Sequence, residues 1–170
     1  MRKYLFLNFL LIIFFSSCTK DFILNVTVSP PLSGIVSPES GSYKEGSTVS
    51  IVATPNLEYE FVGWLGDERG SNNLLSFQMN SNKNIVAQFQ KRKYELKINI
   101  IGEGTVSEEI ISSSKTSDYE SGSVVRLTAI PSSGYYFVGW TKDISGNSNP
   151  VEINIDRAKT ITAKFEKKSY

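Results

Sequence analysis

Few residues in this 170-residue chain have side chains suited to catalysis or metal binding. The sequence contains no histidine, and Cys18 is its single cysteine. A Ser-His-Asp or Cys-His nucleophile, an imidazole metal ligand, a thiolate zinc site and a disulfide framework are therefore all excluded. Carboxylates, aromatic rings and one thiol remain as candidates.

A pair of carboxylates could cleave a glycosidic bond, and one part of the chain holds four acids close together. These acids are Glu58, Glu60, Asp67 and Glu68. Three of the four are replaced at the matching positions of a second, similar segment, by Gly134, Tyr136 and Ile144. A small unit also has little room for the cleft that a polysaccharide substrate needs. We therefore expect no enzyme activity and no cofactor.

A calcium site is a second use for acids, since Asp67 and Asp143 occupy matching positions near several asparagines. The regularly spaced carboxylates of a calcium loop are missing, however. Asx turns, in which the side chain bonds to nearby backbone, explain the same residues more simply. We expect no metal site.

Aromatic rings offer a third chemistry, because an indole face can stack on the C–H face of a sugar ring. The candidate binding residues are Tyr59, Trp64, Tyr135, Tyr136 and Trp140. A small unit without disulfide or metal depends on a compact apolar core, and one tryptophan buries ~150 to 250 Å². Core positions are therefore favoured for both tryptophans, and the tyrosines are more open to a surface role. A carbohydrate-binding module is kept as the alternative function.

The only thiol follows a segment that reads as a secretion signal. A basic start at residues 1–3 precedes the apolar run 4–15, which is shorter than the ~20 residues of a membrane-spanning helix. Ser16 and Ser17 come directly before Cys18. This arrangement resembles the lipobox of bacterial lipoproteins, although Phe15 replaces the usual aliphatic residue. We expect a signal peptide at 1–17 and a lipidated tether at 18–22, the alternatives being a plain signal peptide or an uncleaved anchor.

The lipobox resemblance implies that Cys18 carries acyl chains such as palmitate, and two or more chains hold a protein stably in a membrane. Thr19, where an Asp would retain a lipoprotein at the inner membrane, points to the outer membrane. Lys20 and Asp21 favour export to its outer face. The expected location is thus the cell envelope, as an outer membrane lipoprotein exposed at the cell surface.

The net charge argues against a polyanionic partner. The chain has 18 Lys+Arg and 17 Asp+Glu, and loss of residues 1–17 removes Arg2 and Lys3, which leaves 16 basic and 17 acidic side chains. Neither nucleic acid nor an anionic membrane surface is implied by such a balance. The expected partners are the membrane, through the lipid, and a protein or glycan of unknown identity.

The body of the chain consists of two similar units in tandem. Residues 43–92 match residues 119–168 without gaps, and 19 of 50 positions are identical. Upstream the match continues with gaps. We therefore predict two domains, at 23–91 and 93–168, each near the small end of the usual size range.

Apolar residues alternate with polar ones in every clear segment of both units, as in strands that bury one face. Examples are the runs 48–54, 75–79 and 85–89 in the first unit and 124–129, 151–155 and 161–165 in the second. The prediction is an all-β protein with two tandem small β-sandwich or β-grasp-like repeats of five to six short strands each. Gly63 and Gly139 interrupt a strand, so we expect a β-bulge or a ring lying on the backbone there.

Both units share one long motif, in which a Tyr-x-x-Gly turn leads to Ala-x-Pro, then to Phe-Val-Gly-Trp and to a final Ala-x-Phe. Its residues are Tyr43, Gly46, Ala53, Pro55, Phe61, Gly63, Trp64, Asp67, Ala87 and Phe89 in the first unit, and Tyr119, Gly122, Ala129, Pro131, Phe137, Gly139, Trp140, Asp143, Ala163 and Phe165 in the second. The pattern resembles the divergent internalin B-repeat, a module of bacterial secreted and cell-surface proteins.

The resemblance implies adhesion, display or spacing and brings no catalytic residues. Two pairs of positions differ between the copies: Glu58 stands where the second has Gly134, and Gly66 where the second has Lys142. The expected function is that of a non-enzymatic lipoprotein which presents the repeats as an adhesive or spacer module. A subunit of an envelope complex without a free ligand is a third hypothesis.

Overall fold

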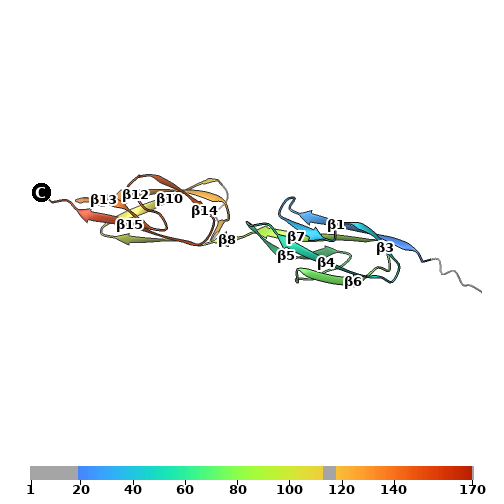
Figure 1. Cartoon of the computed structure of the whole chain (residues 1–170). Helices are drawn as coiled ribbons and strands as arrows, with labels where there is room; N and C mark the ends of the chain where they lie inside the picture. Colours follow the sequence, from blue (N-terminus) through green and yellow to red (C-terminus); the bar gives the residue numbers. More distant parts are fainter. Residues whose placement is uncertain (1–18, 113–117, 170) are drawn as a thin grey trace, which may run out of the picture.

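The computed structural model describes residues 19–112 and 118–169, which form two all-β repeats joined end to end (Figure 1). The predicted signal peptide at 1–17 and the predicted lipidation residue Cys18 lie outside the described residues. Within the described residues the chain forms no helix. The predicted fold class, all-β with two tandem repeats, is confirmed.

The first repeat is a sandwich of two sheets. Its strands are β1 (Asp21–Ser29), β2 (Gly34–Ser37), β3 (Gly41–Lys44), β4 (Thr48–Pro55), β5 (Tyr59–Gly66), β6 (Leu74–Gln78) and β7 (Lys83–Lys91). One sheet has the order β3-β1-β7-β5 and the other the order β2-β4-β6. All neighbours are antiparallel except β1 and β7, the first and last strands, which run parallel.

The second repeat has the same plan. Its strands are β8 (Lys93–Tyr94), β9 (Leu96–Ile101), β10 (Gly104–Ser112), β11 (Tyr119–Glu120), β12 (Ser123–Pro131), β13 (Tyr135–Lys142), β14 (Val151–Ile155) and β15 (Lys159–Lys167). The sheets are β13-β15-β9 and β10-β12-β14, with β8 and β11 paired separately. Again the strand near the start, β9, runs parallel to the last, β15.

Alternating burial holds each sandwich together, as the period-two pattern predicts. In β4, for example, every second residue from Val49 is buried while its neighbours are exposed. The first core consists of Phe22, Leu24, Val36, Val49, Ile51, Ala53, Trp64, Phe77, Met79, Ile85, Ala87 and Phe89. The second consists of Tyr119, Val125, Leu127, Ala129, Trp140, Ile153, Ile155, Ile161, Ala163 and Phe165.

Three details differ from the sequence prediction. The first repeat has seven strands and the second has eight, instead of five to six each, because strands as short as β3, β8 and β11 show too little alternation to be recognised. The sandwich form is observed, whereas a β-grasp would need a helix against the sheet, and the described residues contain none. Finally, β1 already begins at Asp21, since Phe22 pairs with Tyr43 and is buried, so residues 21 and 22 belong to the first sheet and not to the tether.

The bulge expected at the strand glycines is present in both repeats. The β5–β7 register shifts between Phe61 and Gly63, and the β13–β15 register shifts between Phe137 and Gly139. A methyl group on Gly139 would lie 2.9 Å from the carbonyl oxygen of Gly146. Glycine is therefore required by the close approach of another backbone segment.

Candidate functional site

The two tryptophans occupy the same place in their repeats, inside the sandwich. Trp64 in β5 is 1% exposed and Trp140 in β13 is 2% exposed. Phe61 packs on Trp64 with ring centroids 5.2 Å apart, and Phe137 packs on Trp140 at 4.9 Å. Tilted contacts of this kind stabilise an aromatic core.

Each indole N–H is also satisfied inside the fold. Trp64 Nε1 donates to the carbonyl oxygen of Asn72 at 2.7 Å, and Trp140 Nε1 donates to that of Ser148 at 2.9 Å. A buried ring with its N–H already bonded has no face to offer to a sugar. Trp64 and Trp140 therefore serve packing, and the stacking platform considered for the carbohydrate-binding alternative has no exposed indole.

The three candidate tyrosines differ in exposure. Tyr59 and Tyr135 pack partly against the first and second cores, respectively. Tyr136 is 43% exposed and lies on β13, at the edge of its sheet. The structure thus does not bring the five candidate aromatic residues together into one site.

Tyr136 takes part in a small surface network. Its hydroxyl donates to Glu166 Oε2 at 2.9 Å, and Lys164 Nζ lies 2.7 Å from Glu166 Oε1. The hydrogen bond to Glu166 raises the pKa of the Tyr136 hydroxyl. Lys164, with a smaller contribution from Tyr136, lowers the pKa of Glu166. Exposed pairs such as this one contribute little stability.

Asp67 and Asp143, at matching positions of the two repeats, each hold a loop to a strand. Asp67 Oδ2 accepts from the backbone N–H of Asn84 at 2.6 Å, and Asp143 Oδ2 accepts from that of Thr160 at 2.7 Å. The bond from Thr160, followed by the nearby Arg157, lowers the pKa of Asp143. Both carboxylates bond to backbone 17 residues away in the sequence, so the predicted local Asx turns are wrong, although the bonding partner is backbone as expected. No group of metal-binding side chains occurs in the part of the chain that the structure describes.

The four acids considered for glycosidase chemistry are each bound to a different partner. Glu58 lies 3.7 Å from Lys91, and Glu60 accepts from Gln90 at 2.6 Å. Asp67 bonds to backbone as described above, and Glu68 forms a 2.6 Å ion pair with Lys83, which is largely buried. Each of the four acids is therefore held by a contact of its own.

The junction between the repeats is a contact region that the sequence did not reveal. The backbone N–H of Arg92 donates to the carbonyl oxygen of Glu58 at 2.9 Å. The carbonyl oxygen of Arg92 in turn accepts from the N–H of Ser121 at 2.8 Å. The residue that joins the repeats is therefore bonded on one side to the first repeat and on the other to the second.

Side chains add to this junction. Lys91 Nζ lies 3.7 Å from Glu58 Oε2 and donates to the carbonyl oxygen of Ser121 at 3.4 Å. A methyl group on Gly122 would lie 3.2 Å from Glu58 Oε1, so the Glu58 carboxylate reaches the second repeat. The one sequence signal for this contact was the difference between Glu58 and Gly134.

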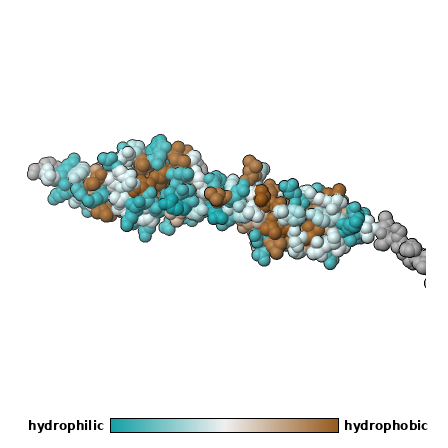
Figure 2. Space-filling view, viewed as in Figure 1, coloured by the Kyte–Doolittle hydropathy of each residue, from teal (hydrophilic) through white to brown (hydrophobic). Residues whose placement is uncertain are grey.

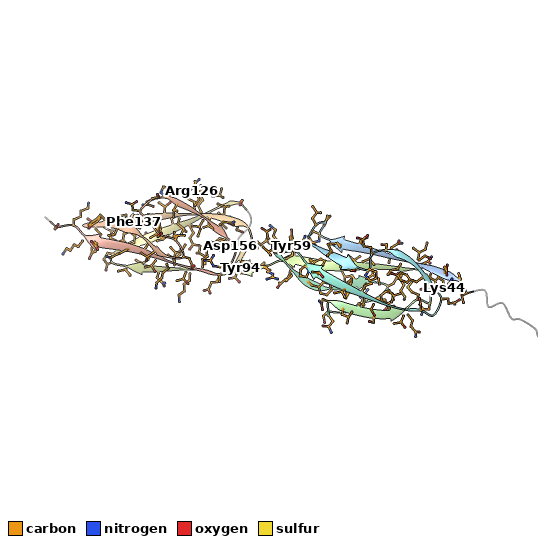
Figure 3. All side chains as sticks on the ribbon, viewed as in Figure 1. Lys44, Tyr59, Tyr94, Arg126, Phe137 and Asp156 are labelled. Carbon is orange, nitrogen blue, oxygen red and sulfur yellow. The ribbon has the colours of Figure 1, made fainter. Side chains whose placement is uncertain are left out.

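The junction also contains a cleft with a volume of about 400 Å³. Its lining residues are Pro55, Asn56, Leu57, Glu58, Arg92, Tyr94, Ser121 and Asp156. Figure 3 shows Tyr59, Tyr94 and Asp156 where the repeats meet, and Lys44 at the opposite end of the first repeat.

Comparison with known families identifies the repeat. A family model described as "Divergent InlB B-repeat domain" matches residues 24–93 and again residues 94–169. No curated protein and no solved structure matches the chain. In residues 19–112 and 118–169, no helix is long and apolar enough to cross a membrane.

Proposed function

The chain belongs to the divergent InlB B-repeat domain family, and from this premise we propose that it is a non-enzymatic lipoprotein acting as a short adhesive or spacer arm in the cell envelope. Repeats of this type are typical of bacterial surface proteins, and a cell-envelope location fits them. The family is generally non-catalytic. Lipidation of Cys18, an outer-membrane location and surface exposure are the finer parts of the proposal.

The observation that carries the proposal is the placement of the two ends. The strand β1 begins at Asp21, three residues after Cys18. Three extended residues span at most about 11 Å, so acyl chains on Cys18 would hold the first repeat close to the bilayer. The repeats lie end to end, and the C-terminal end is at the far tip (Figure 1). Such a chain projects its second repeat away from the membrane.

The bonded junction supports the spacer part of the proposal. Because Arg92 is hydrogen bonded to both repeats, the joint is not a free linker. A stiff joint keeps the tip at a distance from the anchor that a flexible one would not maintain.

Labelling with radioactive palmitate and membrane fractionation test the proposal. The full chain should incorporate label and sediment with outer membranes, and Cys18→Ser should be unlabelled and soluble. Ser17→Ala keeps a small residue before the cysteine and serves as the matched control, which should still be labelled. Unlabelled, soluble wild-type chain would refute the lipoprotein assignment.

Surface exposure requires a separate measurement. Protease added to intact cells should degrade the chain, while a periplasmic control protein survives. A chain that survives in intact cells but is degraded after the outer membrane is opened faces the periplasm, and this result would remove the adhesive role at the cell surface.

A further inference from the structure

The outer face of the β2-β4-β6 sheet in the first repeat carries no charged residue. Its side chains alternate with buried ones and point away from the core. They are Ile35, Ser37, Thr48, Ser50, Val52, Thr54, Leu74, Ser76 and Gln78, and together they form what we call the uncharged face. Ile35, Val52 and Leu74 are 62%, 37% and 53% exposed.

The uncharged surface continues beyond the strands. The segments that contain this sheet and its adjoining loops, 29–38, 46–57 and 70–82, have no Asp, Glu, Lys or Arg. In the view of Figure 2, weakly polar and apolar residues cover much of the visible surface of the first repeat. About a quarter of the residues of soluble proteins are charged, so a face without any charge is unusual.

The second repeat provides an internal comparison for the same sheet. Ser50 and Ser76 are cross-strand partners whose hydroxyl oxygens are 2.7 Å apart. Their counterparts are Arg126 and Glu152, which form a 2.7 Å ion pair, and Arg126 also pairs with Glu109 at 3.1 Å. The fold therefore accepts charges at these positions, and the first repeat lacks them.

We propose that the uncharged face binds the uncharged face of a second copy of this chain. In a two-fold symmetric contact a patch meets itself, so a net charge on the patch would oppose the contact. The uncharged face has no such charge, whereas the matching face in the second repeat has two acids and one arginine. Sheets pack face to face about 10 Å apart, with strand directions close to parallel.

The geometry of a second copy rests on the lipid tether of the proposed function. Two copies held by Cys18 in one bilayer stand side by side at the same height. A two-fold axis along the bilayer normal then brings their first repeats together with aligned strands, as aligned sheet packing requires.

The size of the face predicts that the tether is needed. Three strands at about 4.8 Å spacing and the eight residues of β4 at about 3.3 Å per residue give roughly 380 Å² per copy. A standard stable interface buries about 800 Å² per partner. The contact is therefore weak between free molecules and becomes populated when a membrane raises the effective concentration.

Two serines at matching positions test the contact in the full-length lipidated chain. Ser37 lies on the uncharged face, and Ser107 has the same position in the second repeat, because Ser37 pairs with Val52 and Ser107 with Thr128. In membranes treated with a bis-maleimide reagent, Ser37→Cys should give at least about tenfold more cross-linked dimer than Ser107→Cys. Equal yields, or cross-links from Ser37→Cys to another protein only, would overturn the proposal.

The second repeat also supplies the disrupting variant. Ser50→Arg combined with Ser76→Glu copies the Arg126–Glu152 pair and should reduce the Ser37→Cys cross-link to the level of Ser107→Cys, because the contact would bury charges. Unchanged near-ultraviolet circular dichroism of the chain, to which the buried Trp64 contributes, would show that the variant is folded. An undiminished cross-link in the folded variant would refute the proposed interface.

Fractionation separates the two proposals. If the chain is in the membrane and Ser37→Cys does not form dimers, the lipoprotein assignment stands and the second-copy contact is wrong. If the chain is soluble, the lipoprotein assignment fails, and the contact is then tested by sedimentation of the full chain at millimolar concentration. A monomer there refutes the contact as well, and a dimer lost in the Arg/Glu variant supports it.

Discussion

The backbone of Gly34 lies directly against the ring of Phe89. A methyl group on Gly34 would lie 2.6 Å from Phe89 Cζ and 2.7 Å from the carbonyl oxygen of Thr54. Gly104 and Phe165 repeat the relationship, with a distance of 2.7 Å from the methyl position to the ring. The ring of Phe89, in β7 of one sheet, packs against Gly34 at the start of β2 in the other sheet, and only glycine leaves room for it.

Gly34→Ala should therefore destabilise the first repeat by about 1 to 3 kcal/mol, because the ring and a backbone carbonyl cannot both move away. Urea unfolding followed by tryptophan fluorescence measures the change. Gly70→Ala is the control, since its methyl group would meet Leu75 Cδ1 at an ordinary 3.6 Å. Equal losses for the two variants would contradict the packing explanation.

Iodide should quench the native fluorescence of Trp64 and Trp140 only weakly, because both indoles are almost fully buried. Trp64→Phe and Trp140→Phe leave one tryptophan each and allow the two to be measured separately. Quenching should become strong after unfolding in urea. Native quenching near the unfolded value would show that the indole is exposed and would reopen its use as a sugar platform.

Asp143→Asn should weaken the second repeat at neutral pH. The native pKa of Asp143 is below its ordinary value, chiefly because of the bond from the Thr160 N–H, so the ionised carboxylate favours the folded state. This stability is present above the unfolded pKa of about 3.9 and is lost as pH falls through the native pKa. The difference between wild type and variant should therefore shrink with acidification.

Urea unfolding at pH 7 and at about pH 3 measures this difference. Glu103→Gln, at an exposed acid in the turn between β9 and β10, is the control and should change little at either pH. A variant as stable as wild type at pH 7 would show that the Asp143 bond does not contribute.

Trypsin should not cut the native chain at Arg92, although 91–93 reads Lys-Arg-Lys. Both backbone groups of Arg92 are hydrogen bonded, and cleavage requires an extended, unbonded segment. Mass spectrometry of a limited digest checks this, with urea-unfolded chain as the control that is cut. Early release of two intact repeats would mean that the junction opens readily.

Much of the fold could be predicted because each repeat buries one face of every long strand. The alternation from Val49 to Ala53 and the bulge at Gly63 are local patterns that residue types reveal. The strand β3 could not be recognised, since its four residues are too few to show a clear alternation of apolar and polar side chains. Similarly, Phe22 joins the first sheet through a partner, Tyr43, that is distant in the sequence.

The candidate surfaces could be predicted only in part, since they depend on register. Nothing in the sequence marks Ser50 and Ser76 as neighbours. They lie side by side on the uncharged face only because β4 pairs with β6. The Glu58 substitution was visible, but its contacts with Lys91 and the second repeat depend on how the repeats meet. The buried positions of both tryptophans were favoured from the sequence, because a small unit without disulfide or metal needs a compact apolar core.

The parallel pairing of β1 with β7 has a mechanical consequence. Tension between an anchored start and a held tip would pull these neighbours in opposite directions along their length, so the ladder from Leu24–Lys83 to Ser29–Gln88 would be loaded in shear. The pairing of β9 with β15 would be loaded in the same way. Hydrogen bonds sheared together must break at once instead of one after another, and each repeat would therefore resist extension along its strands.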